Sequence, residues 1–526
     1  MARATNHTTN QQRRGPYLKL ISRFYEPLIL LTALGKTRGA HISAPYDPTP
    51  FHSKRRRLLR NLSYLCDYDK GGDTTCSIGL EERPECFNFW VASNKASSGG
   101  RIIQFLQSTL VDVQRIIVLE ERERFHEEEA FIRKCIEFAR PRVNKEIRLF
   151  LRYAKRCKKY LDREKVAADA QIVTWLEQFD LGEDMLAVDV CYLAYRERKA
   201  SHMQWLSEKI DASSNVDSSF EETIAAFRDF RHCLGRLAHH VRAPKEVLED
   251  SPGFHRLFDE YDVRLVKTGP SNPRPSADAL TELSSILGRM LPAKDSNLTG
   301  YRESLIALDQ KFNIHSRVHA CYRNKNFKPR VHAEIQILEH FYKGNLTFVD
   351  NDSYIGCSKP ACYCCHLYFR HHPYRPVEPE SHQNIWLNWG VPHLPDGGND
   401  RGYKVQRDLL IKMLESIRKE ALDQIIQRAC PLRRHADSET GITKSIMSLS
   451  LGVNTARASS PETRAAAVYL DTVTSGANPN VGRQPDPPPD TDSSSTKEAV
   501  DSSGDLPEDC ASDSGSGSDS DGGASL

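Results

Sequence analysis

The chain has 526 residues, of which 39% are hydrophobic and 27% are charged, and its formal net charge is +2. Its longest apolar run, Pro27 to Gly35, is far shorter than the roughly 18 residues needed to span a bilayer. The composition is therefore that of a soluble protein with one large domain or several ordinary ones, and it argues against a transmembrane helix.

Cysteine usage and charge narrow the cellular setting. The fourteen cysteines are scattered, without a secretory signal or a dense framework, which predicts reduced thiols in a cytoplasmic or nuclear protein that is not secreted. The basic first 25 residues resemble a mitochondrial presequence only weakly, so mitochondrial targeting is not expected.

Residues 484–526 carry a net charge of −10, which leaves +12 on the rest of the chain. A basic body suits phosphate-rich partners, although an acidic tail can equally serve solubility alone.

In chain order, residues 1–50 are expected to be flexible or only partly ordered. Residues 51–99 predict a helix followed by a β-hairpin. The helix is "FHSKRRRLLRNLSYLCDY", whose leucines share one face and whose "KRRR" is expected to be an exposed basic face. The hairpin strands are Thr75–Leu80 and Cys86–Ala92, on either side of a polar "EERPE" turn.

The remaining chain divides into three parts. Residues 100–310 repeat apolar residues every three or four positions, which predicts a large, mostly helical subdomain. Residues 311–430 contain the motifs discussed next. Residues 431–526 are rich in Asp, Ser, Gly and Pro and predict a disordered acidic tail.

One region concentrates residues that bind metals. His332 stands immediately before an apolar-periodic run, so it is expected to lie in the first turn of a helix, with Glu334 close by. Cys362 and Cys365 begin a second predicted helix, where a Cys-x-x-Cys lets both sulfurs face one point and the helix dipole favours thiolates. One imidazole and two thiolates supply three ligands of a tetrahedral Zn²⁺ and leave the fourth position for water. Glu334 is then placed to take a proton from that water as the catalytic residue.

Other interpretations of the cysteines stay open. A structural zinc would use Cys357, Cys362 and either Cys364 or Cys365, which would close the fourth position. The thiols can also be core residues without metal. The carboxylate two residues after His332 favours the catalytic site, because a structural zinc needs no base.

The motifs "VHAE", "YIGCSK" and "CYCC" resemble the OTT-like branch of the zinc-dependent nucleic acid and nucleotide deaminase superfamily, a branch widely represented in fungal proteins. The clear resemblance covers residues 331–392. It implies a cytidine-deaminase-like α/β fold, in which helices sandwich a mixed sheet. It also implies zinc ligation by His332, Cys362 and Cys365, with Glu334 as the proton-transfer group. Downstream, "HQNIWLNWGVP" is similar to the His and Trp-x-x-Pro of that branch, here His382, Trp389 and Pro392.

The resemblance also bears on domain organisation. Deaminase sheets begin with a helix and two antiparallel strands, and residues 53–94 follow this order. Asn94 stands where the superfamily often has an Asn that holds the substrate. Two arrangements remain open: residues 51–99 form a separate domain, or they are the first part of the deaminase sheet and residues 100–310 are an insertion.

The expected activity is zinc-dependent hydrolytic deamination of a nucleobase in a nucleotide, DNA or RNA. Ser358 and Lys359 either contact substrate phosphate or only shape the turn before the second helix, and Trp389 is a further candidate substrate residue. No Pro directly precedes Cys362, unlike in cytidine and tRNA adenosine deaminases, so the base is not inferred. The alternative is a catalytically inactive deaminase-fold protein that serves as an interaction or nucleic-acid-binding module.

Overall fold

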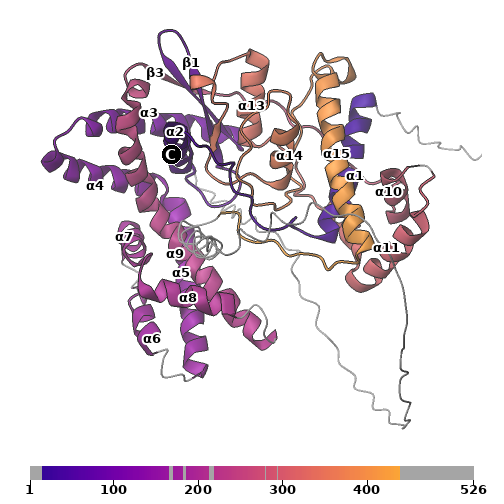
Figure 1. Ribbon diagram of the computed structural model, residues 1–526, viewed down its shortest axis with the longest axis horizontal. Helices are drawn as coiled ribbons and strands as arrows, with labels where there is room; N and C mark the ends of the chain where they lie inside the picture. Colours follow the sequence, from indigo (N-terminus) through magenta and orange to yellow (C-terminus); the bar gives the residue numbers. More distant parts are fainter. Residues whose placement is uncertain are drawn as a thin grey trace, which may run out of the picture. The chain divides into compact units, whose positions relative to one another are not determined.

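The computed structural model describes residues 15–164, 170–181, 185–212, 218–278, 280–292 and 294–438. They form an α/β fold in which helices cover both faces of a four-stranded mixed sheet (Figure 1), so the predicted fold class is confirmed. The acidic tail predicted over residues 431–526 lies outside the described residues from 439 onward. None of the described helices combines the length and the apolarity that a membrane span requires.

The sheet joins segments that are far apart in the sequence, in the order β3-β2-β1-β4. The hairpin strands β1 and β2 are antiparallel, β1 is antiparallel to β4, and β3 runs parallel to β2. The hairpin thus shares one sheet with the strand that precedes the cysteines, as expected if residues 100–310 interrupt a single domain. The domain boundaries themselves stay a prediction. The strands are β1 Cys76–Glu82, β2 Phe87–Ser93, β3 Tyr261–Leu265 and β4 Ile355–Cys357.

Both faces of the sheet are buried because a helix layer covers each. Ile78 and Phe89 pack in one hydrophobic cluster with helix α2 (Pro50–Cys66) and helix α3 (Gly99–Ile117). Ile355 faces the other side and packs with helix α13 (Ala333–Gly344). The helix that starts at the candidate site therefore rests directly on the sheet.

Two glycines allow these helices to approach the strands closely. A Cβ at Gly79 would lie 2.6 Å from Ile337 Cγ2 of α13. A Cβ at Gly356 would lie 2.6 Å from the carbonyl carbon and oxygen of Leu59 in α2. The first contact is with buried side chains, since Phe341 Cε2 also lies 2.8 Å from that Cβ, whereas the second is with helix backbone.

A layer of further helices continues from α13. Helix α14 (Tyr363–His371) contacts α13 and α15 (Tyr403–Ile426), and α15 contacts α1 (Pro16–Leu34), as Figure 1 shows. The N-terminal segment, expected to be flexible or partly ordered, thus contains a core helix whose residues 28–31 are fully buried. A helix that is apolar all round must be buried on all sides, which explains the apolar run there.

The other helices arise mainly from the predicted helical region. Helices α5 and α7 pack along the long helix α9, which in turn contacts α2. Strand β3 also falls within residues 100–310, although that region was predicted to be mostly helical. Helices α10 and α11 of this region contribute buried residues to the same hydrophobic cluster as α1. Part of the region thus lies in the central core. The helices are α4 Glu121–Phe138, α5 Arg140–Glu164, α6 Ala170–Glu177, α7 Ala187–Glu197, α8 Ser201–Ala212, α9 Ser218–Asp250, α10 Leu283–Met290, α11 Leu298–Phe312 and α12 Ile314–Arg323.

The expectation that "KRRR" forms an exposed basic face holds only for Lys54, because the three arginines are buried or half-buried and are paired with acidic residues. Arg55 is buried and pairs with Asp350 and with Asp352, the latter at 3.2 Å. Arg57 pairs with Asp250 at the end of α9, at 2.6 Å. The arginines therefore attach α2 to the segment before β4 and to α9, because acidic residues from distant parts of the chain converge on them.

We predict that Gly356→Ala lowers the free energy of unfolding by about 1–3 kcal/mol, since the added methyl group meets the backbone of α2. Gly79→Ala should also destabilise the protein, because the added methyl group meets the fully buried side chains of Ile337 and Phe341. Urea denaturation followed by circular dichroism measures both. Gly100→Ala is the matched control: Gly100 lies in α3 with no atom within 4 Å of the added Cβ, and this change should leave stability unchanged or raise it. A Gly356→Ala protein as stable as the parent would contradict the proposed close contact.

Candidate active site

The strand β2 positions the start of α13. His332 is the N-cap of that helix, and the backbone N–H of Gln336 donates to its carbonyl oxygen at 3.0 Å. The N–H of Ala333 donates to Asn94 Oδ1 at 2.7 Å, and Gln336 Nε2 donates to the Ser93 carbonyl at 3.2 Å. The end of the hairpin thus satisfies an otherwise unpaired donor of the helix and fixes the backbone that carries His332.

The turn before α14 positions the two cysteines. Cys362 is the N-cap of α14, and its Sγ accepts the backbone N–H of Cys365 at 3.5 Å. The N–H of Tyr363 donates to the Asn384 carbonyl at 3.1 Å, and the N–H of His382 donates to the Ala361 carbonyl at 3.1 Å. The segment around residues 380–384 therefore holds the turn that starts the helix.

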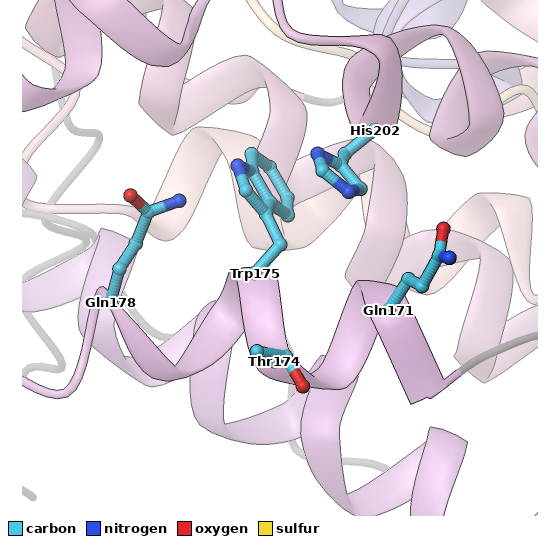
Figure 2. A pocket seen from close by; sticks show the side chains of 5 residues that line it. All are labelled: Gln171, Thr174, Trp175, Gln178 and His202. Atoms are coloured by element: carbon cyan, nitrogen blue, oxygen red, sulfur yellow. The ribbon is translucent and has the colours of Figure 1, made fainter.

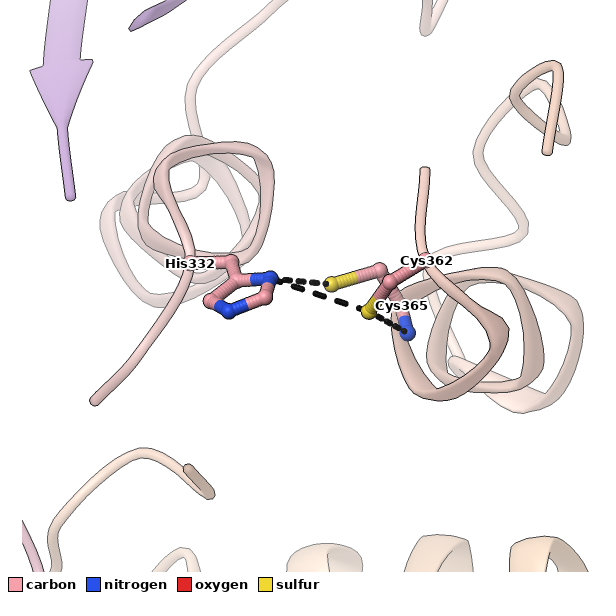
Figure 3. A group of neighbouring side chains, drawn as sticks. All are labelled: His332, Cys362 and Cys365. Atoms are coloured by element: carbon pink, nitrogen blue, oxygen red, sulfur yellow. Dashed lines mark hydrogen bonds between the residues drawn. The ribbon is translucent and has the colours of Figure 1, made fainter. Parts of the chain in front are cut away.

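The three predicted metal ligands converge. Figure 3 shows the His332 ring directed at both sulfurs, with Nδ1 at 3.7 Å from Cys362 Sγ and 3.4 Å from Cys365 Sγ. All three donor atoms lie within 4.8 Å of one another. Around a tetrahedral zinc with ordinary bond lengths, a nitrogen and a sulfur ligand are about 3.6 Å apart. The donor set and its spacing thus fit Zn²⁺.

The thiols differ in their acidity. Burial opposes ionisation of Cys362, but hydrogen bonds with Cys365 and His332 and the charge of His332 lower its pKa well below the usual range. Burial and the neighbouring Cys362 raise the pKa of Cys365 well above it. Cys362, at the N-terminus of α14, is thus the thiol that reaches the metal-binding thiolate form most readily.

Glu334 lies beside this group. It is only 4% exposed, and its Oε2 has no hydrogen-bond partner within the described part of the chain. Burial, followed by the charge of Glu334, raises the pKa of the Cys357 thiol to about 12. A buried carboxylate oxygen without a partner is costly unless a proton or a ligand group satisfies it.

The remaining cysteines of the cluster do not join the three donors. Cys357 ends β4, and Cys364 is fully buried near Tyr25 and Glu420. Neither belongs to the group of His332, Cys362 and Cys365 found among the described residues. The alternative ligand sets that include either of them gain no support from this geometry.

The side chain of Asn94 contacts the first turn of α13. Its Oδ1 accepts from Ala333, and because Ala333 is bonded to His332, covalent geometry keeps the amide within about 10 Å of the imidazole. Its Nδ2 donates to the Gly72 carbonyl at 2.7 Å. Asn94 therefore holds the first turn of α13 and leaves one amide hydrogen for another partner.

Ser358 and Lys359 both contact the buried carboxylate of Asp67, a residue that sequence reasoning did not identify. Asp67 is fully buried, and its Oδ2 lies 3.2 Å from Ser358 Oγ and 3.4 Å from Lys359 Nζ. Ser358 Oγ also accepts the Cys76 N–H at 3.1 Å. These contacts fix the loop between β4 and the cysteines. No local signal marks Asp67, because its partners come from other segments.

Trp389 and His382 are both buried near the site helices. Trp389 is fully buried and packs against Phe24 and Tyr368, with ring centroids 5.6 and 6.0 Å apart. His382 is 3% exposed, and its Nδ1 accepts the Asn384 N–H at 3.0 Å. Burial lowers the pKa of His382. Both side chains thus contribute to packing and positioning in this structure.

A second missed residue, Glu339, links the two helices of the site. Its carboxylate, on α13, accepts the Tyr368 hydroxyl of α14 at 2.7 Å. It also lies 3.1 Å from His372 Nε2 and 2.9 Å from Lys343 Nζ. Burial opposes its ionisation, but His372, Lys343 and Tyr368 lower the pKa of Glu339 to about 2. The helices that carry His332 and the cysteines are therefore joined through one charged group.

An open pocket lies apart from these residues, in the helical region (Figure 2). Its volume is ≈ 510 Å³, and Trp175 stacks on His202 at its wall, with ring centroids 5.1 Å apart. The pocket lacks the thiols and carboxylates that the candidate site combines, so the chemistry favours the His332 region as the active site. The lining residues are Gln171, Thr174, Trp175, Gln178 and His202.

Comparison with known proteins agrees with the motifs. Residues 331–393 match the family model of the OTT_1508-like deaminases, which confirms the resemblance for this segment. No curated protein and no solved structure matches the chain. The matched segment contains His332, Glu334 and both site cysteines.

We predict that Glu339→Gln destabilises the protein at neutral pH by up to about 3 kcal/mol, because the folded-state pKa of about 2 lies below the unfolded value of about 4.3. This stabilisation is complete above the unfolded pKa and is lost as the pH falls through the folded pKa. The stability difference between parent and variant should therefore narrow as the pH is lowered from 7 to 3, measured by urea denaturation.

The matched control is Glu303→Gln, at an exposed position of α11, which should follow the parent at every pH. A constant difference between Glu339→Gln and the parent across this pH range would show that the charge of Glu339 does not stabilise the fold.

Proposed function

We propose that the deaminase-like segment of residues 331–393 is the centre of a zinc-dependent hydrolase that removes the exocyclic amine of a nucleobase. The observation that supports this most is the buried carboxylate of Glu334, with an unpartnered oxygen, next to an imidazole and two thiols at zinc-ligand spacing. A structural metal site has no use for such a carboxylate.

His332, Cys362 and Cys365 would hold the metal. A Zn²⁺ ion held there would lower the pKa of its water ligand and would supply a positive charge near the reacting carbon. These three residues leave one tetrahedral position free, as in catalytic zinc sites. The N-cap position of Cys362 and the fixed first turn of α13 preorganise the ligands, which reduces the cost of assembling the site.

Glu334 would transfer the protons. Hydrolytic deamination consumes one water and releases one ammonia, so one proton of the water must reach the ring nitrogen and the other must reach the leaving amine. A single carboxylate beside the reacting atoms can accept and return these protons. The position of Glu334 in the first turn of α13, two residues after His332, directs it to the same region as the metal ligands.

The substrate is proposed to be a nucleobase in a nucleotide, DNA or RNA, and in a polynucleotide the target base must be unpaired or flipped out. Asn94 remains a proposed substrate residue through its free amide hydrogen. For Ser358, Lys359 and Trp389, the observed contacts support a positioning role, and direct substrate contact stays a prediction. The inactive interaction module keeps the same zinc fold, so only turnover separates the two functions.

We predict that His332→Ala and a Cys362→Ala, Cys365→Ala double variant lose the tightly bound zinc that the parent retains after dialysis. Metal analysis of the purified proteins measures this loss. Cys364→Ala is the control, because Cys364 lies in the same helical turn and is equally buried but does not belong to the group of three donors. Full retention of zinc by the double variant would refute the ligand assignment.

We also predict that Glu334→Gln keeps the zinc and the fold but loses at least about 10²-fold in turnover, the size typical of a general acid–base group. The assay is ammonia release from a panel of bases, nucleosides, nucleotides and single-stranded DNA and RNA. Glu303→Gln should match the parent. A zinc-loaded parent without activity on the whole panel would instead favour the interaction module.

A further inference from the structure

A second group of metal-binding side chains lies outside the candidate active site. His315 Nε2 is 3.1 Å from Glu282 Oε2, and His319 Nε2 is 3.7 Å from Glu282 Oε1. The donor atoms of the three residues all lie within 4.8 Å of one another. One carboxylate therefore faces two imidazole nitrogens at the same time.

The local structure explains why the imidazoles meet. His315 and His319 are one turn apart on α12, so their side chains lie on the same side of the helix, with ring centroids 4.4 Å apart. The apolar residues Ile314 and Val318 are buried in the core, which turns the two histidines away from it. The backbone N–H of His315 also donates to Asp309 Oδ1 at 2.7 Å, which fixes the first turn.

Glu282 reaches this face from another helix. It is the N-cap residue of α10, and α10 and α12 both contact α1. The side chains of Glu282 and His315 are 56% and 46% exposed, so solvent can reach the group. The site thus spans two helices that are packed against a common core helix.

The ion pairs of Glu282 with His315 and His319 do not satisfy every polar atom of this group. His319 Nε2 is shielded from solvent, and its distance of 3.7 Å from Glu282 Oε1 is too long for a hydrogen bond, so it has no hydrogen-bond partner within the described part of the chain. Two nitrogen or oxygen ligands of a tetrahedral zinc are about 3.4 Å apart, and the two observed separations lie on either side of that value. A metal ion between the three residues would satisfy the unpartnered nitrogen.

We propose that Glu282, His315 and His319 form a second metal site, which takes a divalent transition-metal ion, with Zn²⁺ as the ligand set's best match. Two imidazoles and one carboxylate are a common zinc donor set, and water completes the coordination because the group is solvent-accessible. The ion would attach α10 to α12 and thereby stabilise the helices against α1. This site is independent of the proposed deaminase activity, because it contains no thiol and shares no residue with the first.

The test counts the metal ions on the full-length protein. Dialysis against metal-free buffer should leave one zinc per chain, and micromolar free Zn²⁺ should add a second. A His315→Gln, His319→Gln double variant should keep the first and lose the second. A Cys362→Ser, Cys365→Ser double variant should lose the first and still take up the second. His255→Gln, at an exposed position in another segment, should behave as the parent.

Cobalt distinguishes the sites by spectroscopy. Co²⁺ at the thiol site should give strong sulfur-to-metal absorption in the near ultraviolet, whereas the second equivalent should add only weak visible bands. Those weak bands should disappear in the histidine double variant and in Glu282→Gln, which changes a single exposed side chain and tests the site if the double variant unfolds. Unchanged uptake of the second ion by either variant would overturn the proposal.

Discussion

The fold depends on a carboxylate that cannot reach water. Asp67 is fully buried, and its side chain is held by the Thr74 hydroxyl at 2.6 Å and by Arg142 Nη1 at 3.5 Å, besides the contacts with residues 358 and 359. These partners and charges lower its pKa although burial opposes this. Removing any one partner would leave a buried charge uncompensated, which is strongly destabilising. The loop before Cys362 and Cys365 is thus held in place by hydrogen bonds and ion pairs to one buried aspartate.

The same network connects the helical region to the site. Arg142, on α5, also contacts Glu146 at 3.2 Å, and Glu146 meets Arg236 at 2.9 Å and His240 at 3.0 Å, both on α9. The attractions of Arg236 and Arg142 lower the pKa of Glu146 well below its usual range although its burial opposes this. A continuous set of buried charges therefore runs from α9 through α5 to the cysteine loop. The helical region is in this way a structural support of the candidate active site.

Sequence reasoning worked where the information is local. The spacing of His332, Glu334, Cys362 and Cys365 and the periodicity around them led to residues that the structure brings together. Two β-rich runs on either side of a polar turn located the β1–β2 hairpin. It failed where the outcome depends on distant partners. "KRRR" has the composition of an exposed face, yet acidic residues from other segments pair with it. Strand β3 was missed although its sequence, Tyr-Asp-Val-Arg-Leu, alternates apolar and polar residues as a half-buried strand does; its short length and its place between long helical segments concealed this signal.

The pairing of β1 with β4 has a consequence for synthesis of the chain. Ser77 pairs with Cys357, so the central strand keeps one edge uncovered until most of the protein has left the ribosome. An unpaired strand edge is a template for unwanted association, and pairing between distant segments folds slowly. During translation, the early helices and the hairpin must persist without their final neighbour. Until β4 pairs with β1, the partly folded chain is therefore exposed to aggregation through this edge.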